Sequence, residues 1–221
     1  MVCAMNVGKA LRLRRIFGRG RALVVDLSAL EPDPVALVRR LAHTGVDAVI
    51  LSPGLLETVA EELGDLAVIL SSPVEDVLQA GADAVITPGS DLPQAAPAAR
   101  RSGIPVFARM PEGSSPRALW NAVHVGADVL CLDARSADDA LQVARAAGRA
   151  VVAGLADARD VVNQAHTLLQ RPVQGLLLRH EALIETACLD ALHALVHQGV
   201  PAAEAAALLQ RARAATQGNR G

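Results

Sequence analysis

The heptapeptide GVDAVIL at residues 45–51 recurs as GADAVIT at residues 81–87 and as GADVLCL at residues 126–132. Each copy begins with a glycine of the kind that ends helices, and each continues into a short apolar run typical of a buried strand. The repeat therefore marks a passage from helix to strand. A unit of this kind that recurs along a chain predicts alternating strands and helices.

Outward from this repeat, short apolar runs continue along the chain at regular intervals. The stretches between them are amphipathic, and several close on glycine. The predicted strands lie at about residues 22–27, 47–52, 66–71, 83–87, 104–109, 128–132, 150–154 and 174–179. Eight near-continuous apolar strands, with no glycine-rich phosphate loop after the first, favour a closed barrel over an open doubly wound sheet. The predicted fold class is therefore α/β, a (β/α)8 TIM barrel.

The barrel is expected to occupy residues 22–216, including an extra C-terminal helix beyond the eighth unit. A short basic arm, residues 1–21, precedes it, since the segment GKALRLRRIFGRGR holds six basic residues from Lys9 to Arg21 and no acidic one. Residues 217–221 are expected to form a frayed tail. The charges of the arm are not interleaved with aromatic residues, which disfavours binding to nucleic acid.

The overall composition argues against several classes of protein. A net charge of -2 and a pI near 6.3 give no global attraction to nucleic acid or to an anionic membrane. Cys3, Cys131 and Cys188 follow no metal-ligand or redox spacing, which indicates a reducing compartment. No apolar run approaches the ~20 residues of a membrane span. We therefore expect a cytoplasmic protein without a metal or a cofactor.

Five segments carry a resemblance to a known family. They are GKALRLRRIF at 8–17, VEDVLQAGADAVI at 74–86, IPVFARMPEG at 104–113, GADVLCLDA at 126–134, and the end of the chain from Gly175 through LDALHALVH. In order and placement they resemble class I aldolases of the DeoC/FbaB group, which include archaeal-type fructose-bisphosphate aldolase and 2-amino-3,7-dideoxy-heptulosonate synthase. The resemblance implies a homo-oligomer, and an arm that covers the bottom of the barrel or mediates subunit contacts.

The resemblance also implies a loss of the family's chemistry. In the family a lysine at the end of the sixth strand forms a Schiff base with a ketose carbonyl, and a tyrosine at the end of the fifth handles protons. Cys131 stands at the lysine position and Met110 at the tyrosine position. The only lysine, Lys9, precedes the barrel and is expected to lie away from the carboxyl-terminal mouth where barrel active sites sit. Because a thiol cannot form the imine, the chain resembles a degenerate member of the family.

Other family positions are partly kept. Asp26 matches the aspartate of the first strand, although Leu27 and Ser28 replace the histidine and glycine that follow it in the family. The family binds phosphate through glycine-rich backbone after the seventh and eighth strands, and of these glycines Gly154 remains. The eighth strand ends instead in Leu178-Arg179-His180-Glu181.

The predicted strand ends bring polar side chains to one rim. One interpretation has Arg109 and Arg179 binding a carboxylate or phosphate, with Asp26 or Asp133 as general base and His180 as general acid. The alternative is a buried ion-pair network of Asp26, Arg109 and Asp133, left from the ancestral site. A mouth filled by apolar side chains would favour a scaffold. The residues proposed for that filling are Leu27, Met110, Leu155 and Leu178.

Two further site chemistries are less favoured. Cys131 would be an active thiol if Arg109 lowered its pKa, but a lone cysteine within VLCL is typical of a core position. His180, Glu181, Asp133 and Asp26 would have to hold a divalent metal without any recognised ligand spacing.

Two hypotheses for function follow. The first is a degenerate aldolase-like barrel that binds a ligand without catalysis or serves as an assembly partner, in a homo-oligomer or beside an active paralogue. The second is a lyase or isomerase that acts on a phosphorylated or carboxylated carbonyl compound without a lysine imine. Both predict a small anionic metabolite, such as a sugar phosphate or a keto acid, as the partner. Neither requires nucleic acid or a membrane.

Overall fold

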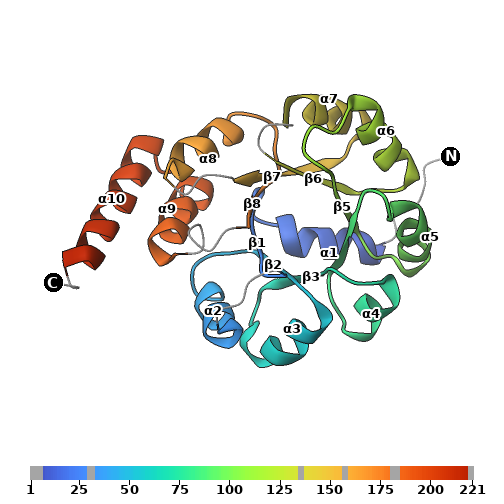
Figure 1. Ribbon diagram of the computed structural model, residues 1–221, viewed down its shortest axis with the longest axis horizontal. Coiled ribbons are helices and arrows are strands. Elements are labelled where there is room, and N and C mark those ends of the chain that lie inside the picture. Colours follow the sequence, from blue (N-terminus) through green and yellow to red (C-terminus); the bar gives the residue numbers. More distant parts are fainter. Residues whose placement is uncertain (1–6, 29–32, 134–136, 156–158, 180–184, 219–221) are drawn as a thin grey trace.

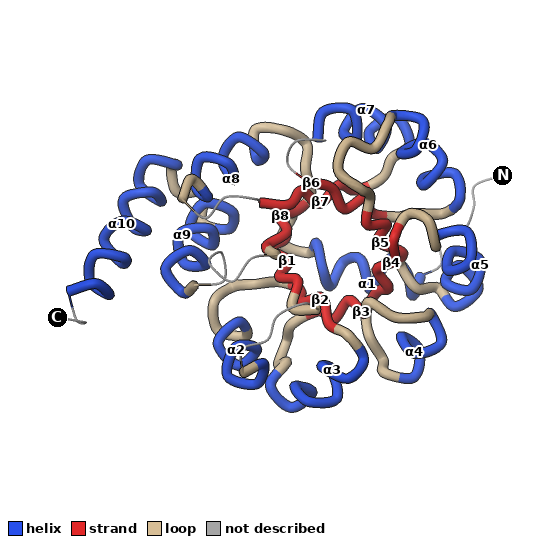
Figure 2. Tube along the Cα trace, viewed as in Figure 1, coloured by secondary structure: helices blue, strands red, loops and turns tan. Residues whose placement is uncertain are grey.

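The computed structural model describes residues 7–28, 33–133, 137–155, 159–179 and 185–218. Its eight parallel strands pair in chain order, and the last pairs with the first, so the sheet closes into a barrel. Figure 1 shows the helices arranged around the outside of this barrel, and Figure 2 shows the strands as an inner ring. The predicted (β/α)8 barrel with a C-terminal helix is confirmed.

Each strand lies within two residues of its predicted bounds. The strands are β1 (Ala22–Asp26), β2 (Ala48–Leu51), β3 (Ala67–Leu70), β4 (Ala84–Pro88), β5 (Val106–Arg109), β6 (Val129–Asp133), β7 (Ala150–Leu155) and β8 (Gly175–Leu178). The helices are α1 (Val7–Phe17), α2 (Pro34–Leu41), α3 (Pro53–Val59) with the 3-10 turn η1 (Ala60–Glu62), α4 (Val74–Gln79), α5 (Leu92–Ser102), α6 (Pro116–Val125), α7 (Ala137–Ala147), α8 (Val161–Leu169), α9 (Thr186–His197) and α10 (Ala202–Gly218). No helix in the described ranges is both long and apolar enough to cross a membrane.

Apolar side chains pack in two layers because successive residues of a strand point to opposite faces. The outer layer, between the strands and the helices, includes Leu23 and Val25 of β1. The inner layer fills the barrel and includes Val24 of β1, Phe107 of β5 and Cys131 of β6. The inward positions at the carboxyl ends of the strands are therefore the ones that line the mouth.

The amino end of the barrel is closed by α1, which crosses the opening in Figures 1 and 2. Ile16 of α1 is buried in the inner layer, and the ring of Phe17 stacks on Phe107 with 6.2 Å between centroids. Burial of Ile16, with Phe17 half-buried beside it, stabilises the contact of α1 with the barrel, since a fully buried large apolar side chain contributes roughly 1.5–3 kcal/mol.

The basic residues of this arm pair with buried aspartates. Lys9 Nζ lies 2.7 Å from Asp128 Oδ2 and Arg15 Nη1 lies 3.1 Å from Asp83 Oδ2. The arm therefore supplies positive charge to the amino end of the barrel. As expected, the only lysine lies away from the mouth.

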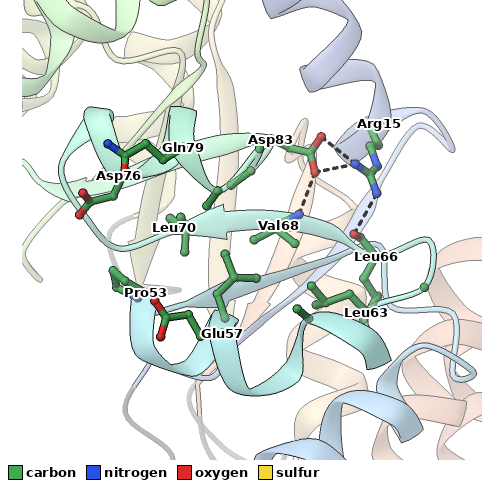
Figure 3. Close-up of a pocket in the computed structure, with 16 residues that line it drawn as sticks. Arg15, Pro53, Glu57, Leu63, Leu66, Val68, Leu70, Asp76, Gln79 and Asp83 are labelled. Atoms are coloured by element: carbon green, nitrogen blue, oxygen red, sulfur yellow. Dashed lines mark hydrogen bonds and ion pairs between the residues drawn. The ribbon is translucent and has the colours of Figure 1, made fainter.

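The same aspartates bind the backbone of the strands, which explains the repeat in the sequence. Each repeat aspartate precedes an even-numbered strand and accepts the amide hydrogen of a residue in the strand before it. The contacts are Leu23 N to Asp47 Oδ2 (2.8 Å), Val68 N to Asp83 Oδ2 (2.9 Å), Val106 N to Asp128 Oδ2 (2.9 Å) and, with glutamine instead, Val151 N to Gln174 Oε1 (2.7 Å). We call these four contacts the clasps. Figure 3 shows one of them, with Arg15 bound to the same Asp83.

Candidate functional site

An ion pair bridges the mouth of the barrel. Asp26 ends β1 and Arg109 ends β5, two strands on opposite sides of the closed sheet. Arg109 Nη2 donates to Asp26 Oδ2 over 2.6 Å. The carboxylate is almost buried, at 7% exposure, whereas the arginine side chain is 34% exposed. The pair is therefore open to solvent from the arginine side.

The second oxygen of Asp26 is held locally. Ser28 donates to Asp26 Oδ1 twice, from its backbone nitrogen over 3.1 Å and from Oγ over 2.6 Å. An ionised carboxylate can accept about four hydrogen bonds, and Asp26 accepts three from the described residues. These contacts hold the carboxylate in place against Arg109.

A second arginine lies beside the pair. Arg179 follows β8, the neighbour of β1, and its Nε is 4.0 Å from Asp26 Oδ2. Its side chain is 26% exposed. Two guanidinium groups thus share one carboxylate, which leaves a formal charge of +1 among these three side chains. The buried Nε of Arg109 has no hydrogen-bond partner among the described residues.

Cys131 lies beneath this cluster, in the inner layer. Burial raises the pKa of its thiol to about 12, although Arg179 and Arg109 act to lower that pKa. Asp26 raises it further. The group at the family's lysine position is therefore a protonated thiol near neutral pH, and the hypothesis of an active thiolate is not supported.

The apolar residues whose presence at the mouth would favour the scaffold hypothesis lie in the outer layer instead. Leu27, Met110, Leu155 and Leu178 are all buried in the outer layer. Each is adjacent in sequence to an inward-facing position, so its own side chain points outward. The apolar filling that would have favoured a scaffold is therefore not made by these residues. Met110, at the family's tyrosine position, packs beside Gly89 in this layer.

Three predicted site residues are only partly placed. Gly154 lies in β7, in register with Asp133 of β6 and Leu177 of β8. The side chain of Asp133 and the whole of His180 lie outside the described residues, so their roles stay predictions. Within the described part of the chain, no three His, Cys, Asp or Glu side chains are grouped so as to hold a metal ion.

Ser28 is the residue of this site whose contact was missed. Ser28 was predicted to lie at the rim beside Asp26, as a replacement for a family glycine, but not to supply two of the three donors to that aspartate. A signal was present, because an aspartate that accepts from the backbone two residues later is a common turn at the end of a strand.

Comparison with solved structures agrees with the fold. An archaeal fructose 1,6-bisphosphate aldolase superposes with a TM-score of 0.68 at 20% identity, over 86% of this chain and 100% of the other. An HpcH/HpaI aldolase/citrate lyase family protein from Burkholderia cenocepacia gives 0.62 at 15% identity, over 96% and 100%.

Other similar barrels have unrelated chemistry. A thiamine phosphate pyrophosphorylase from Pyrococcus furiosus gives a TM-score of 0.61 at 18% identity, over 86% of this chain and 100% of that one. No protein-family model and no curated protein matches the sequence. Because barrels of one shape host many activities, these likenesses establish the fold, and function has to be argued from the site.

Proposed function

We propose that this chain is a degenerate aldolase-type barrel that binds a small anionic metabolite, a sugar phosphate or a keto acid, at its mouth without Schiff-base catalysis. The observation that carries the proposal is the cluster of Arg109 and Arg179 around the single carboxylate of Asp26. The chain's only lysine is bound to Asp128 at the opposite end of the barrel.

The arginines are suited to binding an anion. Guanidinium groups match carboxylate and phosphate oxygens in pairs, and Asp26 fixes one of them in place before any ligand arrives. A hydrogen bond to a charged group contributes about 1.5–3 kcal/mol, so two such contacts correspond to a dissociation constant near the millimolar range. That affinity suits a metabolite.

The same residues argue against covalent catalysis. A nucleophile needs either a depressed pKa or an adjacent base, and Cys131 has a pKa of about 12 and is buried. Asp26 already accepts three hydrogen bonds. The described side chains of the mouth therefore favour binding over turnover.

The test is thermal unfolding of the purified chain with fructose 1,6-bisphosphate, dihydroxyacetone phosphate and pyruvate, each in large excess. A ligand at ~100 times its Kd adds about 2.7 kcal/mol, which raises Tm by roughly 5–10 °C for a domain of this size. We expect one class to shift Tm, and Arg109→Gln or Arg179→Gln to remove the shift. Arg117→Gln, an exposed arginine at the start of α6 on the same side of the barrel, is the matched control.

Two results would contradict the proposal. A flat response across all three compounds would mean that the mouth is only an internal ion-pair network. Incorporation of pyruvate or dihydroxyacetone phosphate into the protein after borohydride reduction, seen as a mass increase, would mean that an imine forms.

A further inference from the structure

The amino end of the barrel holds a second concentration of positive charge. A cavity of about 820 Å³ between α7 and α8 is lined by four arginines, Arg21, Arg145, Arg149 and Arg171, which we call the arginine pocket. Arg21 and Arg149 immediately precede β1 and β7, and Arg145 lies in the last turn of α7. Because the strands are parallel, this cavity is at the end of the barrel opposite the mouth.

The positive charges of the pocket are incompletely neutralised. Arg21 Nη2 donates to a neutral acceptor, the carbonyl oxygen of Leu169, over 2.7 Å. Arg149 Nη1 lies 3.5 Å from Asp128 Oδ1, but Lys9 is closer to the same carboxylate, at 2.7 Å. These two arginines therefore keep most of their charge available.

The other two arginines face solvent. Arg171 Nη1 lies 2.9 Å from Asp138 Oδ1, on an aspartate that is 76% exposed, where water weakens the pair. Arg145 is exposed and has no acidic partner among the described side chains. Both guanidinium groups can be approached from outside, so the pocket has an entrance lined by cations.

The negative partial charges at the carboxyl ends of the neighbouring helices do not account for four arginines. The carboxyl end of a helix carries about half of an elementary negative charge, which one arginine in the last turn already balances. The carboxyl ends of α7 and α8 together carry about one elementary negative charge, whereas the pocket has four guanidinium groups. Among the described residues that line the cavity, none is acidic.

We infer that the arginine pocket is a binding site for a small molecule with two linked phosphate groups, separate from the mouth. Planar guanidinium groups bind phosphate oxygens in pairs, and four of them exceed what a single phosphate requires. The floor is apolar, with Leu141, Ala144 and Val151 almost fully buried beneath the arginines. That floor fits an organic group attached to the diphosphate, and the volume is within the usual range for small-ligand sites.

The experiment is isothermal titration of the full chain with inorganic pyrophosphate, with ADP and with inorganic phosphate, at low ionic strength. We expect pyrophosphate and ADP to bind and phosphate to bind more weakly. Arg145→Gln and Arg171→Gln should each reduce the affinity for pyrophosphate by about tenfold, the usual effect of losing a hydrogen bond to a charged group. Arg145 is exposed and the pair of Arg171 with Asp138 is weakened by water, so both variants should unfold close to the wild-type temperature.

Two matched controls locate the binding. Arg101→Gln removes an exposed arginine from the last turn of α5 and should leave the affinity unchanged. Arg117→Gln, exposed at the start of α6 at the opposite end of the barrel, should also leave it unchanged. Tighter binding of ADP than of pyrophosphate would show that the apolar floor takes part, and equal binding would assign recognition to the diphosphate alone; either supports the site.

Three outcomes would overturn the inference. The first is no binding of pyrophosphate or ADP, and the second is equal weakening by Arg101→Gln, which would indicate general charge attraction. The third is loss of binding in Arg109→Gln but not in Arg145→Gln, which would move the ligand to the mouth and leave the proposed function standing. Conversely, if no sugar phosphate or keto acid binds at the mouth, the inference about the arginine pocket still stands.

Discussion

The two ends of this barrel use arginine–aspartate pairs in different ways. At the amino end, Asp47, Asp83 and Asp128 each accept a backbone amide hydrogen as well as facing a cation. At the mouth, the described aspartate is Asp26, and its donors are Arg109 and Ser28, which lies two residues further along the chain. A carboxylate tied to the backbone of a neighbouring strand stabilises the sheet, whereas one tied to side chains mainly orients them.

Exposure does not separate the two ends. The aspartates are almost buried at both, and the cations that face them range from 18% exposed for Lys9 to 65% for Arg19 at the amino end, against 34% for Arg109 at the mouth. The difference lies in the backbone contacts of the amino-end aspartates. We therefore expect substitutions at the amino end to change stability, and substitutions at the mouth to change ligand binding.

The largest effect is expected for Asp128→Ala. It removes the acceptor of Val106 N and the counter-charge of Lys9 and Arg149 at once, so the free energy of unfolding should fall by about 3 kcal/mol. Urea denaturation measures the change. Asp65→Ala, an exposed aspartate just before β3, should change stability by less than about 0.5 kcal/mol. Equal effects of the two substitutions would remove the distinction between the ends.

A smaller difference, between Gly45→Ala and Gly148→Ala, tests how tightly the amino end is packed. Gly45 has φ +74°, and an added Cβ would lie 2.0 Å from His193 Nδ1. Gly148 has φ +63° with no neighbour within 4 Å, so Gly148→Ala carries only the backbone cost of about 1 kcal/mol. Gly45→Ala should destabilise by about 2 kcal/mol more than this in the same denaturation experiment. A difference near zero would mean that His193 moves aside freely.

The fold was predictable because its signals are local. An apolar run and a helix-ending glycine identify a strand wherever they occur, so all eight strands followed from the repeat and its relatives. The role of the repeat aspartates was not predictable in this way. Asp47 acts on Leu23, and that contact exists only once β1 and β2 are adjacent and in register.

The candidate site was predictable in part. Asp26, Arg109 and Arg179 were selected because each ends a strand, and the structure brings these three together. Leu27 and Met110 do not fill the mouth, because side chains alternate along a strand and the residue after an inward one points to the outer layer. The pairing of Asp26 with Arg109 across the barrel also depends on closure, which no local pattern specifies.

At the mouth, Asp26→Asn should lower the free energy of unfolding by only about 1 kcal/mol, because Arg109 remains solvated. It removes the negative charge that Arg109 and Arg179 share among the described side chains, so any anion that binds there should bind several-fold more tightly. Titration of the variant with the compound that shifts Tm of the wild type measures this. Weaker binding would mean that Asp26 contacts the ligand or that its orientation of Arg109 outweighs its charge.

The smallest effect is expected for the thiol of Cys131. Its pKa of about 12, raised by burial, keeps the folded chain's thiol protonated, so its alkylation should be far slower than that of the unfolded chain at every pH between 7 and 9. In urea the same residue should react about tenfold faster for each pH unit up to its ordinary pKa, near 8.5. Mass spectrometry of the peptide that contains Cys131 reports both rates. Rapid labelling of the folded chain would restore the active-thiol hypothesis.

The clasps also divide the molecule. Each one joins an odd-numbered strand to the even-numbered strand that follows it, so they fall within the pairs β1–β2, β3–β4, β5–β6 and β7–β8. A cut in the connection between β4 and β5 would therefore leave every clasp whole inside one of two half-barrels. The clasps therefore repeat once for every two strands, and they give the amino end of the barrel a fourfold periodicity that the eight-stranded sheet itself does not have.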